Sequence, residues 1–209
     1  MKTPLIKLLA FLLIISSFAI ASCHSGAKDS TTIADSANQQ QIAKTDSANK
    51  AAVKGTDSTL KANKKLDEDA SKFLVKNYEA GLFEIQLSQL ATTNGLDADV
   101  KNLAASLVTA HTAINAKMSA IAASANFVLP VAIDADHQKA LQDIGKLTGA
   151  DFDKKYINTI VDGHEKAVSD YKDAYKNLSP GDTKDFAAAT LPKIEDHLAM
   201  AKKVRDRIK

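Results

Sequence analysis

The sequence predicts an all-α fold, a four-helix bundle with a short extra helix between the second and third long helices. Apolar residues recur at spacings of three and four through four segments of about 25 residues each. No segment alternates apolar and polar residues for long enough to form a strand. The 209-residue chain contains only 8 Gly and 4 Pro, and several of these stand between the periodic segments, as helix stop signals do.

The chain opens with the pattern of an export signal. Lys2 and Lys7 form a charged start, residues 8–18 are apolar apart from two serines, and mainly small residues follow up to Cys23. This order predicts a signal peptide over residues 1–22. The apolar run is shorter than the roughly 20 residues of a membrane-spanning helix, so a cleaved leader is favoured over a transmembrane segment.

Cys23 is the single cysteine of the chain. Residues 20–23, Ile-Ala-Ser-Cys, resemble the lipobox of bacterial lipoproteins, in which the cysteine is lipidated and becomes the first mature residue. The resemblance implies a membrane anchor through lipid on Cys23. His24 follows in place of Asp, so the inner-membrane retention signal is absent. We therefore expect a cell-envelope protein on the outer membrane that faces the periplasm; the alternative is an ordinary secretory signal with an incidental cysteine.

Residues 23–66 are expected to form a disordered tether behind the lipidated cysteine. They are rich in Ser, Thr, Asp, Lys and Ala, lack aromatic residues, and contain isolated apolar residues such as Ile33 and Ile42. Such a segment buries too little apolar surface to offset the entropy lost on ordering. The sequence Asp-Ser-Ala-Asn occurs at residues 35–38 and again at 46–49, which we interpret as duplicated spacer.

The folded domain is expected to span residues 67–209. Periodicity predicts helices over residues 69–94, 97–125, 134–147, 152–178 and 182–208. Asn94-Gly95, Pro130, Gly149 and Pro180-Gly181 separate them. Pro192 lies inside the last helix and is expected to bend it, because proline removes one backbone hydrogen bond.

Four polar side chains fall on stripes that are otherwise apolar. His111, His164 and His197 each take an inward position in a different long helix, and one acceptable stripe of the first helix places Glu84 inward. With a rise of 1.5 Å per residue, each lies about 18–22 Å from its helix start, close to the middle. A residue at the middle of a helix stays at the middle when the helix runs in the opposite direction. We therefore expect the four side chains to share one layer whatever the topology.

Three imidazoles and a carboxylate form a ligand set for a divalent transition metal, here Zn, Cu or Fe. The sequence thus predicts one metal ion held by Glu84, His111, His164 and His197. The alternative is a structural polar layer, in which the histidines hydrogen-bond to one another, to Glu84 and to water.

The domain also resembles a bacterial family of predicted outer-membrane or exported proteins of unknown function, placed in the ferritin-like group. The matching segments are residues 73–76, 79–85, 90–91, 110–112, 152–153 with Tyr156, 162–164, 191–192 and 197–198. The resemblance covers about residues 67–208. It implies a ferritin-like helical bundle and marks Glu84, His111, His164 and His197 as candidate functional residues, without an established reaction.

One departure argues against a di-iron oxidase. Di-iron bundles carry a glutamate three residues before each liganding histidine, whereas Val108, Val161 and Ile194 occupy those positions here. The one acidic residue at this spacing is Asp134, before His137, on the short connecting helix, where we expect it to cap the helix or lie exposed.

Composition excludes other classes. A single cysteine rules out a disulfide framework or a cysteine-built metal site. Lys2 and Lys7 leave with the leader, so the 27 basic and 25 acidic residues become 25 of each, and no nucleic-acid binding is expected. Phosphate-loop, nucleophile-elbow and zinc-protease motifs are missing. We expect a non-enzymatic envelope lipoprotein that binds one metal; the alternatives are a metal-dependent oxidoreductase and a partner-binding structural protein without metal.

Overall fold

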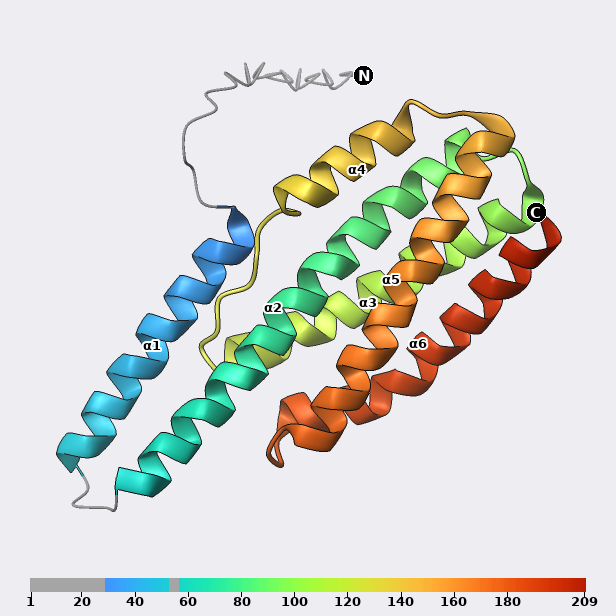
Figure 1. Ribbon diagram of the computed structural model, residues 1–209. Coiled ribbons are helices and arrows are strands. Elements are labelled where there is room, and N and C mark those ends of the chain that lie inside the picture. The colour runs from blue at the N-terminus through green and yellow to red at the C-terminus, as the bar shows by residue number, and fades with distance from the viewer. Residues whose placement is uncertain (1–28, 53–56) are drawn as a thin grey trace, which may run out of the picture.

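The computed structural model describes residues 29–52 and 57–209, and every regular element in these ranges is a helix (Figure 1). The helices are α1 (Ser30–Ala52), α2 (Asp57–Asn94), α3 (Ala98–Ser124), α4 (Ala135–Gly145), α5 (Gly149–Asn177) and α6 (Asp182–Arg207). The predicted all-α helical bundle is confirmed. None of the described helices is both long and apolar enough to span a membrane. The expected signal peptide and Cys23 lie outside the described residues.

Helices α2, α3, α5 and α6 form the four-helix bundle. Helix α2 packs mainly against α3 and also against α5, while α6 packs mainly against α5 and also against α3. Asp153 near the start of α5 accepts hydrogen bonds from the backbone N–H groups of Leu96 and Asp97 in the α2–α3 loop. Arg207 at the end of α6 pairs with Asp97 as well. Hence α2 and α6 run in one direction, and α3 and α5 in the other.

This topology requires one long connection, from the end of α3 to the start of α5 at the opposite end of the bundle (Figure 1). Helix α4 lies in that crossover and packs against α2 and α5. Its first turn is capped by Asp134, whose side chain accepts the backbone N–H of His137 at 2.7 Å. The crossover therefore brings α4 onto the outer flank of α2.

The hydrophobic core consists of two clusters of buried side chains. The first includes Phe83, Leu87, Val100, Leu103, Leu107, Phe152, Tyr156, Ile157, Ile160 and Val161. The second includes Phe73, Leu74, Ile114, Met118, Ala122, Tyr171, Ala174, Leu178, Phe186 and Ile194. Along α3, Leu107 belongs to the first cluster and Ile114 to the second, so His111 lies between them. A polar layer thus divides the core near the middle of the bundle.

The inward stripe of α5 shifts near the end of the helix. A strict spacing of three and four residues through His164 and Tyr171 places Tyr175 inward, yet Tyr175 is 53% exposed, and Ala174 is buried in its place. A straight α-helix has 3.6 residues per turn, so a stripe spaced by three and four residues drifts around the helix over several turns. The core side chains of α5 follow this drift.

The expectation of a disordered tether over residues 23–66 needs correction where the structure describes these residues. Helix α1 covers residues 30–52, and α2 begins at Asp57, ten residues before the expected start of the folded domain. Asn38 exchanges two hydrogen bonds with the backbone of Val128, at 2.6 and 3.0 Å. Ala34 and Ile42 are buried on the same side of α1. Packing against α2 and the pairing with a loop 90 residues away order α1, although its composition is polar.

Candidate metal centre

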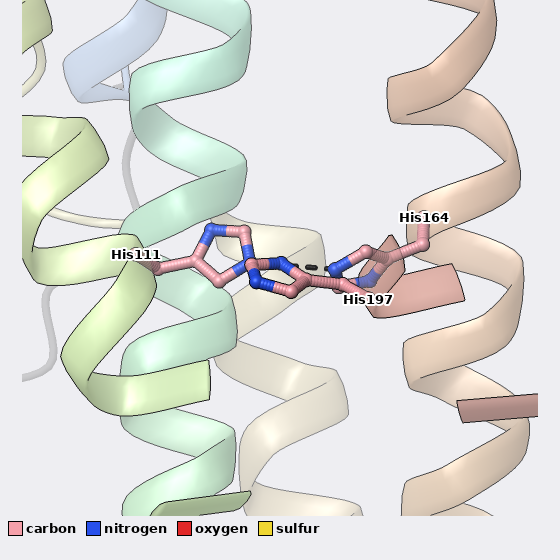
Figure 2. Close-up of side chains that lie close together, drawn as sticks. All are labelled: His111, His164 and His197. Carbon is pink, nitrogen blue, oxygen red and sulfur yellow. Dashed lines mark hydrogen bonds between the residues drawn. The ribbon is translucent and has the colours of Figure 1, made fainter. Parts of the chain in front are cut away.

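Each of the four inward polar side chains comes from a different bundle helix. Glu84 is on α2, His111 on α3, His164 on α5 and His197 on α6. All four are buried, and each belongs to the polar layer between the two hydrophobic clusters. Figure 2 shows the three imidazole rings directed toward one another. The structure therefore brings together the four residues that the sequence singled out.

The three imidazoles are close enough to share an ion. The Nε2 atoms of His111 and His164 are 3.4 Å apart, and the ring centroids of the three histidines are separated by 5.3 to 5.5 Å. One nitrogen of each lies within 4.8 Å of the others. Nitrogens that bind zinc tetrahedrally at 2.0–2.1 Å are about 3.4 Å apart. The first pair already has this spacing, and small side-chain rotations would bring His197 to it.

Glu84 bridges two of the imidazoles. Its Oε2 lies 3.0 Å from His111 Nε2, and its Oε1 lies 3.3 Å from His164 Nδ1. The ligand atoms that all lie within 4.8 Å of one another belong to the three histidines, and Glu84 is not among them. Burial alone would raise the pKa of Glu84, but the charges and hydrogen bonds of His111 and His164 together lower it by more. The net pKa of Glu84 is therefore well below the usual range. Glu84 therefore supplies a negative charge beside the imidazoles.

His164 is oriented by its own helix. Its Nδ1 lies 3.0 Å from the carbonyl oxygen of Ile160, one turn earlier in α5, which can accept a hydrogen bond from that nitrogen. Its Nε2 then faces His111 Nε2 as an acceptor. Such a hydrogen bond to the second nitrogen is the usual way in which proteins orient a liganding histidine. Burial is the largest single effect and lowers the pKa of His164. The charge and hydrogen bond of Glu84 and the hydrogen bond to Ile160 together raise it by more, so the net pKa is above the usual value.

His197 has a buried nitrogen without a partner. Its Nδ1 is shielded from solvent and makes no hydrogen bond to the described part of the chain. Burial, together with the charges of His111 and His164, lowers the pKa of His197 to about 4. The imidazole is therefore neutral near pH 7 and can donate a lone pair. Because an unsatisfied buried polar atom costs about 1–3 kcal/mol, a ligand at this position would remove a penalty.

A second cluster of metal-binding residue types lies beside α4. His137 Nδ1 is 2.8 and 2.9 Å from the two carboxylate oxygens of Glu79 on α2, and 3.6 Å from Asp134 Oδ1. Asp134 caps α4, which was one of the two roles expected from its spacing to His137. Glu79 was not singled out in the sequence, because α2 is apolar on most sides and no periodic stripe distinguishes this residue.

Both clusters line one cavity of about 470 Å³. Glu84 and His111 contribute from the polar layer, while Glu79, Asp134 and His137 contribute from the side of α4. Volumes of 300–1,000 Å³ are typical of small-ligand sites. The polar layer is thus open to a cavity on one side of the bundle.

Comparison with known proteins gives a family without an assigned activity. The model of a domain of unknown function, DUF4142, matches residues 55–204. No curated protein and no solved structure matches the chain. The matched range contains both histidine clusters and the cavity between them, so any chemistry must be argued from their geometry.

Proposed function

The chain belongs to the DUF4142 family, and since that family has no known function, we propose from the geometry of the polar layer that the protein binds one divalent transition metal, Zn, Cu or Fe. His111, His164 and His197 supply three nitrogen ligands. Glu84 acts either as a fourth ligand or as the carboxylate that accepts hydrogen bonds from the imidazoles. This donor set is one that all three metals accept.

The unpaired Nδ1 of His197 is the observation that carries this proposal. A purely structural polar layer would be expected to pair its buried nitrogens, because more than about 90% of buried polar groups in proteins are hydrogen-bonded. Here Glu84 pairs with His111 and His164. The third imidazole is held neutral beside them, which suits coordination of an ion.

We place the protein in the cell envelope as a lipoprotein, anchored through Cys23 to the outer membrane and facing the periplasm. The signal pattern of residues 1–22 and the lipobox-like residues 20–23 support this placement. We also assign the bundle to the ferritin-like group. The single long crossover between α3 and α5 supports this assignment, since ferritin-like bundles have one such connection.

A second candidate function is a metal-dependent oxidoreductase. The cavity that reaches Glu84 and His111 favours it, because a catalytic metal needs an open coordination position next to a space for substrate. If the ion is redox-active and turns over oxygen or peroxide, the variants that remove the ion will also remove the activity.

The decisive experiment measures metal binding to the full chain in detergent, after chelation and dialysis. We expect the wild-type protein to bind Zn²⁺, and the double variant His111→Gln/His164→Gln to lose at least about 100-fold in affinity for that ion. The estimate follows from the 10–100-fold loss typical when only a supporting partner of a ligand is removed. Thr190→Val, which changes another buried polar residue of α6, serves as the control and should bind normally. Equal affinity of the double variant and the control would overturn the proposal.

The anchor has its own test. Cells that express the wild-type chain and are fed labelled fatty acid should incorporate the label into the protein, and Cys23→Ala should abolish it. Label that persists in Cys23→Ala would contradict the proposed lipidation.

A further inference from the structure

The cluster of Glu79, Asp134 and His137 has the spacing of a metal site. Ligands at 2.0–2.2 Å from a common ion are about 2.8–3.6 Å apart in octahedral and tetrahedral geometries. His137 Nδ1 lies 2.8 and 2.9 Å from the Glu79 oxygens and 3.6 Å from Asp134 Oδ1. One ligand atom of each residue is already within 4.8 Å of the others.

The three side chains are held in place by other contacts. The Glu79 side chain is only 5% exposed, and its Oε1 accepts the backbone N–H of Asp134 at 2.9 Å. Asp134 accepts the backbone N–H of His137 at 2.7 Å. The ring of His137 stacks on Phe83, with centroids 4.2 Å apart and an interplanar angle of 13°. A site whose ligands are oriented in advance loses less free energy in ordering them when an ion binds.

The charge of the cluster matches a divalent cation. Two carboxylates face one imidazole. In the absence of an ion, a proton shared between His137 and Glu79 can occupy the space that the ion would take. Replacement of that proton by a divalent ion leaves the two carboxylate charges neutralised. Carboxylate oxygens combined with one imidazole nitrogen suit first-row ions such as Zn²⁺, Fe²⁺ and Mn²⁺.

The cluster can be reached from solvent. The side chains of His137 and Asp134 are 33% and 30% exposed, in contrast to the buried polar layer. Both line the 470 Å³ cavity, whose lining also carries Asp162 and Asp170. Lys76 and Lys166 line the same cavity, and Lys76 pairs with Asp170, so these lysines offset the further carboxylates.

We propose that Glu79, Asp134 and His137 form a second, outer site for a divalent cation, in the same cavity as the buried histidines. The outer site uses none of the four residues of the proposed function and does not depend on it. The protein would then hold two ions on one cavity, one among imidazoles and one among mostly oxygen ligands.

Equilibrium dialysis of the full chain against Zn²⁺ tests the outer site. The variant Glu79→Gln/Asp134→Asn keeps an oxygen acceptor for the Asp134 position and a good N-cap for α4, because Asn caps as well as Asp. We expect two ions per chain for the wild type, and one ion for this variant. His111→Gln/His164→Gln should also retain one ion.

The outcomes separate the two sites. If Glu79→Gln/Asp134→Asn binds as many ions as the wild type with equal affinity, the outer site is refuted. If His111→Gln/His164→Gln binds as many as the wild type, the proposed function is refuted instead. A measurement on the wild-type protein tests the outer site even if the variant does not fold. In ¹⁵N-histidine-labelled wild type, the Nδ1 resonance of His137 should shift during the Zn²⁺ titration. An unmoved resonance at saturation would likewise refute the outer site.

Discussion

The inner cluster (Glu84, His111, His164 and His197) and the outer cluster (Glu79, Asp134 and His137) both combine histidine with carboxylate side chains, but they differ in how completely their polar atoms are paired. In the outer cluster, His137 and Glu79 pair with each other, and Asp134 caps α4. In the inner cluster, Glu84 pairs with two imidazoles and leaves His197 Nδ1 unsatisfied. Residue type alone therefore does not define a site. The polar atoms of the outer cluster satisfy one another without an ion, whereas the inner cluster leaves a buried nitrogen unpaired within the described part of the chain.

The largest expected effect comes from Glu84→Gln, which removes the one carboxylate of the inner cluster. Loss of one partner of a buried ion pair typically costs about 3–5 kcal/mol. We expect a loss of this size in the free energy of unfolding, measured with urea in the presence of a chelator near pH 6. Glu165→Gln is the matched control, because Glu165 follows His164 but lies exposed and pairs with Lys202 at the surface. A loss no greater than that of the control would show that the inner carboxylate is not needed.

The next largest effect is a loss of folding stability at low pH, caused by His197. The pKa of His197 is lowered to about 4 in the folded protein, against about 6.5 for an unperturbed histidine. Between these values the unfolded chain binds the proton and the folded chain does not, so stability falls as the pH drops from 6.5 toward 4. The contribution is at most about 1.4 kcal/mol per pH unit.

The variant His197→Gln should remove this part of the pH dependence. We expect the urea unfolding free energy of the chelated variant to fall less steeply between pH 6.5 and pH 5 than that of the wild type. Parallel pH profiles for the two proteins would contradict a buried neutral imidazole at this position.

A smaller effect separates the two roles of Asp134 in the outer cluster. Asp134→Ala removes the N-cap of α4 and should cost about 1 kcal/mol, whereas Asp134→Asn keeps the cap and should cost little. Thermal unfolding of both variants in chelator measures the difference. Equal losses would mean that the charge of Asp134, rather than its cap, stabilises the ion-free protein.

The smallest expected effect is at Gly163, where α5 approaches Glu84. A Cβ added at Gly163 would lie 3.0 Å from Glu84 Oε1, so the carboxylate would have to shift. Gly145 is the matched position, because its added Cβ would meet only Leu90 Cδ1 at 3.5 Å. Alanine in a helix is favoured over glycine by up to about 1 kcal/mol. We expect Gly145→Ala to show most of this gain in the free energy of unfolding. Gly163→Ala should show a smaller gain and should also bind Zn²⁺ more weakly.

The bundle and the inner cluster were predictable because both depend on local periodicity. Stop signals such as Asn94-Gly95 mark the helix ends, and a histidine on an apolar stripe must face the interior wherever the stripe does. Mid-height then brings the side chains into one layer without knowledge of topology. The sequence did not indicate that Glu84 would contact only two of the three imidazoles, because this depends on rotamers and on the close approach of Gly163.

Features that depend on pairing between distant segments were not predictable from one sequence. The contact of Glu79 with His137 requires the path of the crossover, which sets α4 against α2. The order of α1 requires Asn38 to meet the backbone of Val128. Asn38 ends the first of two identical Asp-Ser-Ala-Asn segments, and nothing in the repeat shows that one copy meets a partner.

The polar layer also fixes the axial alignment of the four helices. It separates two hydrophobic clusters, so a helix that slid by one heptad, about 10 Å, would bury an imidazole among aliphatic side chains and leave its neighbours facing an apolar residue. The first cluster adds a buried hydrogen bond between Ser88 on α2 and Tyr156 on α5, but this contact joins two helices, whereas the layer joins all four. The ends of the bundle beyond these contacts could therefore be lengthened or shortened by whole heptads in an engineered version, while the central layer keeps the helices aligned.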